Sequence, residues 1–241
     1  MRPLALVASL LAPVLASAQT APAPLFTVVS RRVIYPASFI PVTPRQAQEA
    51  PMTLILEEGS DWQRHGMLER VMGKASAIFA QCGVSIGEVD ALVVRWSPEA
   101  LRRLNIENPY AGPAQMAVMD EPQIPALRPL GFLFAEGKIP STASAYNGNS
   151  VRQYARQFPQ AVRLLNTFWI TSGQETRPRR RDELPSYSVT AHELAHLWGD
   201  MGHVPVRPNL MSDFEDPGSK SGDLTAEQCV EIAKLHLLRA P

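Results

Sequence analysis

One short motif constrains this chain more than any other feature: His192-Glu193-Leu194-Ala195-His196, an HExxH sequence. On a helix, residues four apart lie on the same face, so the two imidazoles can bind one metal ion together. Zinc accepts histidine nitrogen in tetrahedral sites and tolerates an open position. Glu193 stands beside the first histidine, where its carboxylate can act as a base on a water molecule whose pKa zinc lowers. The motif therefore predicts a helix that carries a zinc site with its own base.

The residues after the motif favour the zinc interpretation. Gly199 allows the helix to end and the chain to turn away, and His203 follows where a third ligand can return to the metal. Asp200 is the alternative third ligand, because carboxylate oxygen also binds zinc. A competing interpretation is an amphipathic helix with solvent-facing histidines, in which Thr190 and Glu193 form a capping box.

The segment resembles the signature of the metzincin zinc proteases, HExxHxxGxxH followed by a turn that contains methionine. The residues that match are His192, Glu193, His196, Gly199, His203 and Met211. One difference is that the third histidine stands one residue later than in the family, because Gly202 occupies its usual position. The resemblance implies an α+β fold: a metzincin-like zincin domain with a twisted mixed sheet of about five strands, an active-site helix and two further long helices.

The resemblance also implies an activity, namely a zinc-dependent endopeptidase that acts on a peptide or protein substrate. His192, His196 and His203 would bind one Zn²⁺, Glu193 would be the general base, and Met211 would lie beneath the site without ligating. Two alternatives stay open. One is a zinc-containing domain that binds a protein partner without cleaving it. The other is a gluzincin-like peptidase whose third ligand is a distal carboxylate such as Glu215.

The N-terminus has the pattern of a secretory signal peptide over residues 1–18. Arg2 supplies a positive charge, an apolar stretch follows from Leu4 to Leu15, and residues 16–18 form a small-residue cleavage site. The apolar stretch is shorter than the roughly 20 residues that a spanning helix needs. We therefore expect an exported protein, periplasmic or secreted, without a membrane span.

Composition predicts a globular domain after a leader. Hydrophobic residues make up 45% of the chain and the formal net charge is zero, which argues against a disordered charged chain and against nucleic acid as a partner. Residues 19–51 are rich in alanine and proline, so an irregular linker, a packed arm or a propeptide is expected there. Residues 52–241 are expected to form the zinc metallopeptidase domain.

Hydrophobic periodicity predicts the main elements of this domain. Apolar residues at three- and four-residue steps predict a helix over Asp61–Gln81, with Asp61 as N-cap, and a closing helix over Leu224–Leu238. Ser186 or Ser188 is the expected N-cap of the motif helix. Apolar runs predict strands over Met52–Glu58, Val84–Trp96, Leu130–Phe134 and Asn166–Thr171. The family resemblance implies an edge strand that pairs with substrate at about Ser141–Tyr146.

The chain contains two cysteines, Cys82 and Cys229. An even number of cysteines in an exported chain predicts a disulfide between them, and the alternative is a pair of free thiols in the core. Neither residue is close to the HExxH motif in sequence, so we expect no cysteine nucleophile.

Overall fold

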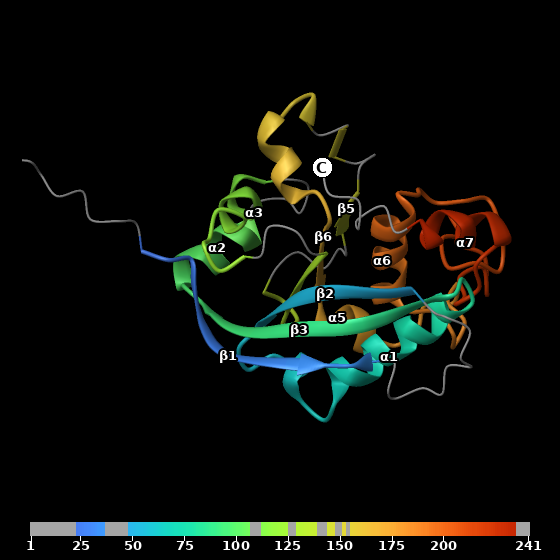
Figure 1. The fold of residues 1–241 in the computed structure, drawn as a ribbon, viewed down its shortest axis with the longest axis horizontal. Coiled ribbons are helices and arrows are strands. Elements are labelled where there is room, and N and C mark those ends of the chain that lie inside the picture. The colour runs from blue at the N-terminus through green and yellow to red at the C-terminus, as the bar shows by residue number, and fades with distance from the viewer. Residues whose placement is uncertain are drawn as a thin grey trace, which may run out of the picture.

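The computed structural model describes residues 23–36, 48–106, 112–124, 129–138, 144–147, 151–152 and 155–234. The expected signal peptide lies outside the described residues, as do residues 141–143 of the expected edge strand and 235–238 of the expected closing helix. Six strands form one mixed sheet with the order β1-β3-β2-β4-β6-β5 (Figure 1). They are β1 (Phe26–Ile34), β2 (Gln48–Glu57), β3 (Val84–Trp96), β4 (Leu130–Phe134), β5 (Ser144–Tyr146) and β6 (Thr167–Thr171).

The four central strands, β3, β2, β4 and β6, run parallel to one another, and β1 and β5 pair antiparallel at the two edges. The residues of β4 and β6 are all buried, as expected for parallel strands covered on both faces. All four strands predicted from apolar runs are present. The α+β class and the mixed sheet agree with the structure, but the expected number of strands, about five, is wrong because the sheet has six.

The sixth strand is β1, in a segment where proline density predicted irregular structure. Phe26–Ile34 itself contains no proline, so its amides can all enter the ladder, and it pairs with β3 from Phe26 opposite Trp96 to Ile34 opposite Val89. The Phe26 and Trp96 rings pack with their centroids 5.0 Å apart. The strand therefore belongs to the same sheet as the residues after 51.

Helices cover both faces of the sheet. They are η2 (Asp61–Gln63), α1 (Met67–Ala80), α2 (Pro98–Ile106), α3 (Pro113–Val118), η3 (Pro159–Leu164), α5 (Ser172–Thr176), α6 (Val189–Gly199) and α7 (Ala226–Ala233). Helices α1, α6 and α7 share one hydrophobic core, whereas α2, α3 and η3 contribute to a second core on the opposite face (Figure 1). Across the described residues, no helix has the length and apolarity that a membrane span requires.

The first long helix begins later than predicted. Its N-cap is Gly66, because His65 and Gly66 adopt left-handed conformations, with φ of 50° and 63°, that no α-helix can include. Trp62 is not part of α1: it lies in η2, fully buried, and its indole nitrogen donates to the Phe134 carbonyl of β4 at 3.0 Å. The prediction of Asp61 as the N-cap is therefore wrong.

The predicted disulfide is present. Cys82, just after α1, and Cys229, in α7, are bonded through their sulfur atoms. Helix α6 contacts both α1 and α7, and the Phe79 and Trp198 rings pack with centroids 4.6 Å apart. The disulfide thus joins the two helices that flank the HExxH helix.

Candidate metal centre

Two side chains fix the start of α6, the helix that carries the motif. The Ser188 hydroxyl accepts a hydrogen bond from the Ala191 amide at 3.2 Å, and Glu175 of α5 accepts from the Thr190 amide at 2.5 Å. A carboxylate here satisfies an amide that has no partner within the helix and complements the helix dipole. Of the two expected N-caps, Ser186 and Ser188, the structure has Ser188. Thr190 lies inside the helix, so it forms no capping box with Glu193.

Three imidazole rings meet at one side of α6. His192 and His196 project from the helix and His203 returns from the loop that follows it. The ring centroids are 4.8 Å apart for His192 and His196, and 5.0 Å apart for each pair that includes His203. One nitrogen atom from each ring lies within 4.8 Å of the other two, an arrangement that can hold a metal ion.

Backbone carbonyls fix the orientation of two of these rings. His192 Nδ1 lies 2.8 Å from the Leu210 carbonyl oxygen, and His196 Nδ1 lies 2.8 Å from the Met201 carbonyl oxygen. A carbonyl oxygen can only accept, so each Nδ1 carries the proton and each neutral ring keeps its lone pair on Nε2. Hydrogen bonds of this kind set the tautomer of histidines that bind metals through Nε2.

The local environment favours the neutral form of all three rings. Burial lowers the pKa of His192 well below the usual value, and the neighbouring His196 lowers it further. Burial also lowers the pKa of His196 to about 4, against a weaker opposing effect of the hydrogen bond to Met201. The pKa of His203 is lowered by burial first and then by the charge of Lys220, although this ring is the most exposed of the three. Neutral imidazole is the form that binds metal.

This set of donors fits a zinc ion. In a tetrahedral site with Zn–N bonds of about 2.0–2.1 Å, two ligand nitrogens lie about 3.3 Å apart. His192 Nε2 and His203 Nε2 lie 3.1 Å apart, close enough to share a hydrogen bond or one cation. Three neutral imidazoles are also a known donor set of catalytic zinc. The geometry, the tautomers and the protonation state of these residues all suit the ion.

Neither alternative ligand lies in the cluster. Asp200 is the C-cap of α6, and its carboxylate lies 3.6 Å from the Arg152 guanidinium. The Glu215 carboxylate is 78% exposed and lies 3.7 Å from the Arg180 guanidinium. Within the described part of the chain, the group that brings three potential ligand atoms together contains His203 and neither carboxylate.

At the end of α6, the chain does not turn at Gly199 as we expected. Asp200, not a glycine, takes the left-handed conformation, with φ of 44°, and Gly202 has no positive φ. Gly199 lets the Met201 side chain pack against the end of the helix, because a Cβ there would lie 2.0 Å from the Met201 Cε atom, which would have to move. The helix therefore ends through an aspartate in the αL conformation, which short polar side chains tolerate better than most residues.

Glu193 is buried beside the cluster, with 6% of its surface exposed. Burial raises the pKa of its carboxyl to about 8. A nearby cation would lower this pKa again, because an opposite charge favours the carboxylate. Tyr187 adds to the same environment: its ring lies 5.9 Å from the His192 ring, and its hydroxyl pKa is raised by burial and then by the Glu193 charge.

Met211 lies in a buried turn after His203. Its side chain is fully buried in the core that includes α6, its amide donates to Asn209 Oδ1 at 2.9 Å, and its carbonyl accepts from the Val204 amide at 2.8 Å. The preceding Leu210 carbonyl is the partner of His192. This turn thus contacts His192 directly and is hydrogen-bonded to the residue after His203.

Sequence reasoning missed the groups that hold the histidines. Leu210 and Met201 act through backbone carbonyls, which every residue has, so no sequence signal marks them. Asn209 is different, because asparagine often accepts from the amide two residues later, as it does here. That signal was available beside the methionine. Tyr187 carried no signal beyond being an aromatic residue shortly before the motif.

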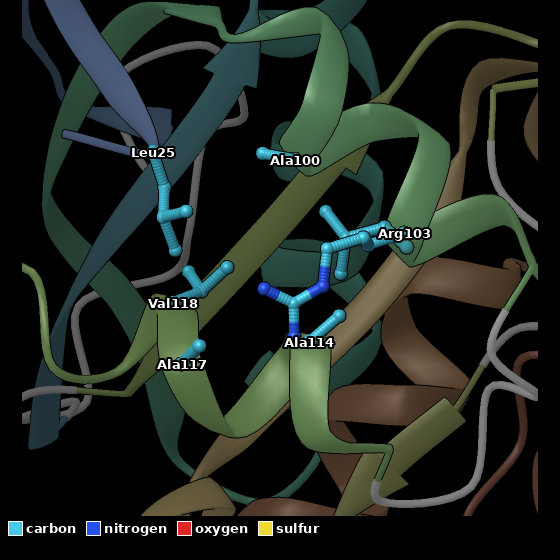
Figure 2. Close-up of a pocket in the computed structure, with 7 residues that line it drawn as sticks. Leu25, Ala100, Arg103, Ala114, Ala117 and Val118 are labelled. Carbon is cyan, nitrogen blue, oxygen red and sulfur yellow. The ribbon is translucent and has the colours of Figure 1, made fainter. Parts of the chain in front are cut away.

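A small hollow is present on the opposite face of the sheet. It lies between the start of β1 and helices α2 and α3, and its lining includes Leu25, Ala100, Arg103 and Ala114 (Figure 2). Its volume is about 10 Å³, room for about one water molecule.

Comparisons with known proteins show only that the fold of this chain is similar to that of a solved structure. No protein-family model matches this chain, and no curated protein matches its sequence. Among solved structures, the chain is similar to the crystal structure of archaemetzincin from Methanopyrus kandleri, with 13% sequence identity and a TM-score of 0.45 over 79% of this chain and 97% of that chain. At this level of similarity, what this chain does must be argued from its own side chains.

Proposed function

We propose that this protein is an exported, zinc-dependent endopeptidase. The observation that carries the proposal is the cluster of three histidines next to a buried glutamate. One ligand atom of each histidine lies within 4.8 Å of those of the other two. His192, His196 and His203 would hold one Zn²⁺ through ring nitrogens. Export rests on the secretory pattern of residues 1–18. The proposed catalytic domain comprises residues 52–241 together with β1, which pairs with β3 in the same sheet.

The residues of the chain divide the chemistry between them. When bound, zinc supplies a Lewis acid that polarises a carbonyl group and lowers the pKa of water. Glu193 takes a proton from the attacking water and returns it to the leaving amine. Its burial next to the histidines suits this role, because a cation held there would lower the raised carboxyl pKa and favour the carboxylate, the form that accepts a proton. The Leu210 and Met201 carbonyls keep the imidazoles of His192 and His196 in position throughout the reaction.

The substrate is proposed to be an extended peptide that adds to the sheet at β5. This strand is the last one of the described sheet on the side of β6, and it contacts α6. Pairing at a sheet edge gives main-chain hydrogen bonds that do not depend on the substrate sequence. Such a peptide would run past the histidine cluster.

A domain that binds zinc and a protein without cleaving it is the weaker alternative. Such a domain has no use for a proton acceptor, whereas burial of the Glu193 carboxyl costs free energy that a catalytic role would explain. A gluzincin-like ligand set receives no support, because Glu215 lies away from the cluster.

The deciding experiment measures bound metal and hydrolysis on the same samples. We expect about one zinc per chain in wild-type protein and cleavage of peptides from a mixed library. In the His192→Ala/His196→Ala double variant, stoichiometric zinc and cleavage should both be lost, because a single histidine ligand does not retain zinc on dilution. Full zinc occupancy in this variant would show that the motif is not the metal site.

A further inference from the structure

A buried asparagine just after β5 contacts the turn between His196 and His203. Asn147 follows β5 directly and is 6% exposed. Its side-chain amide donates to the His196 carbonyl at 3.1 Å and to the Met201 carbonyl at 3.3 Å. The His196 carbonyl belongs to the last turn of α6, where carbonyls lack partners within the helix.

The Met201 carbonyl is shared between two donors. It accepts from His196 Nδ1 at 2.8 Å and from the Asn147 amide at 3.3 Å. A carbonyl oxygen has two lone pairs and can satisfy both. The position of this one oxygen therefore sets the orientation of the His196 ring, and Asn147 fixes that oxygen. Asn147 also holds the turn from which the chain proceeds to His203.

The same segment makes a second contact with the turn. The Arg152 guanidinium lies 3.6 Å from the Asp200 carboxylate. The Val151 amide donates to the Asn147 carbonyl at 2.9 Å, which connects the two contacts. An exposed ion pair contributes little, so the buried amide of Asn147 is the stronger link.

We infer that Asn147 is a positioning residue of the metal centre and that it couples the order of β5 to zinc binding. The inference rests on the proposed zinc site. It extends that proposal, because β5 is the strand at which substrate is proposed to pair. Coupling between two sites is reciprocal. If Asn147 links β5 to the histidines, zinc must stabilise β5 as much as an ordered β5 favours zinc.

The test compares two substitutions on neighbouring residues. Asn147→Asp keeps the size of the side chain but replaces the NH₂ donor with oxygen, which repels both carbonyls. Tyr146→Phe is the matched control. It removes the hydrogen bond from the Tyr146 hydroxyl to Gln115 Oε1 at 2.8 Å, which also anchors β5, but it leaves the Asn147 contacts in place. Both variants should lose thermal stability.

Only the Asn147 variant should lose zinc affinity. We expect its zinc dissociation constant, measured by chelator competition, to rise 10- to 100-fold, the usual effect of removing an outer partner of a metal ligand. Tyr146→Phe should stay within about 2-fold of wild type. In hydrogen exchange, zinc should slow exchange across residues 144–147 of wild type and Tyr146→Phe, but not of Asn147→Asp. Should Asn147→Asp not fold, Asn147→Ala replaces it, and the wild-type exchange result still decides.

The outcomes separate the two proposals. Wild-type zinc affinity in the Asn147 variant, or wild-type β5 exchange that zinc leaves unchanged, would overturn this inference and leave the proposed function standing. A wild-type protein that binds no zinc would overturn both.

Discussion

At the scale of single residues, the role proposed for Glu193 differs from the role proposed for the histidines. Its neighbours His192 and His196 offer lone pairs to a metal ion, whereas Glu193 accepts and releases a proton. Burial raises its carboxyl pKa to about 8, and a cation held by the histidines would lower it again in favour of the carboxylate. The two roles are therefore separable by substitution.

Glu193→Gln keeps the shape of the side chain and removes the proton acceptor. We expect this variant to retain about one zinc per chain while turnover of a peptide substrate falls by about 10²- to 10⁴-fold. Glu57→Gln is the control, because Glu57 is also a buried glutamate but lies on β2 and accepts from the Ala135 amide at 2.8 Å. Turnover of the Glu193 variant equal to that of the Glu57 variant would remove Glu193 from the mechanism.

The third ligand is tested by comparing His203 with Asp200. His203→Ala should raise the zinc dissociation constant by at least about 100-fold, because two histidines alone hold zinc poorly. Asp200→Asn should change it by less than about 3-fold, since that side chain faces Arg152 instead of the histidines. Isothermal titration with zinc measures both constants. The opposite order would mean a ligand set of two histidines and one aspartate.

The three histidines that the structure brings together were predicted from sequence, whereas the backbone groups that orient them were not. His192 and His196 were identifiable because residues four apart lie on one face of a helix. His203 was the expected third ligand, with Asp200 as the alternative. The Leu210 and Met201 carbonyls were not, because any residue supplies a carbonyl and only the fold decides its direction. Asn147 is an intermediate case: it stands next to the expected edge strand, but its contacts with α6 are long-range.

At the scale of elements, the start of α6 determines where the HExxH face points. Ser188→Ala should cost about 1 kcal/mol of unfolding free energy, the usual effect of losing an N-cap. It should also weaken zinc binding, because His192 lies in the first turns of the helix. Thr225→Ala removes the equivalent cap of α7, where the hydroxyl accepts from the Gln228 amide at 3.2 Å. We expect similar stability loss in both variants, by urea unfolding, but a larger loss of zinc affinity in the first. Equal zinc affinities would contradict this view of α6.

Element prediction failed in two places for different physical reasons. β1 was assigned to an irregular segment because of the prolines around it, yet the strand from Phe26 to Ile34 is free of proline. The predicted helix began too early, at Asp61, because the apolar spacing of α1 continues back to Trp62. Trp62 lies instead in η2, and its indole nitrogen donates to the Phe134 carbonyl of β4. Periodicity cannot tell a helical turn from a 3-10 turn that buries the same side chain.

At the scale of the whole molecule, hydrogen bonds connect α7, the helix that carries Cys229, to the candidate metal centre. Gln228, next to Cys229 in α7, exchanges two hydrogen bonds with the Asn209 side chain, at 2.8 and 3.0 Å. Asn209 in turn accepts from the Met211 amide, beside the Leu210 carbonyl that holds His192. The covalent link between α1 and α7 therefore fixes the helix that supports this turn.

Replacing both cysteines, Cys82→Ala/Cys229→Ala, should lower the free energy of unfolding strongly and the zinc affinity only slightly. The bond closes a loop with a sequence separation of 147 residues, for which chain entropy alone gives about 5 kcal/mol, an upper value for real proteins. Zinc affinity should fall less than 10-fold, because Gln228 and Asn209 still pair in the folded state. Urea unfolding and chelator competition measure the two effects, and mass spectrometry without reductant checks that wild-type protein carries the bond. Unchanged stability in the double variant would show that packing alone holds α7 in place. A zinc affinity as low as that of Asn147→Asp would instead mean that the disulfide itself holds the turn that contacts His192.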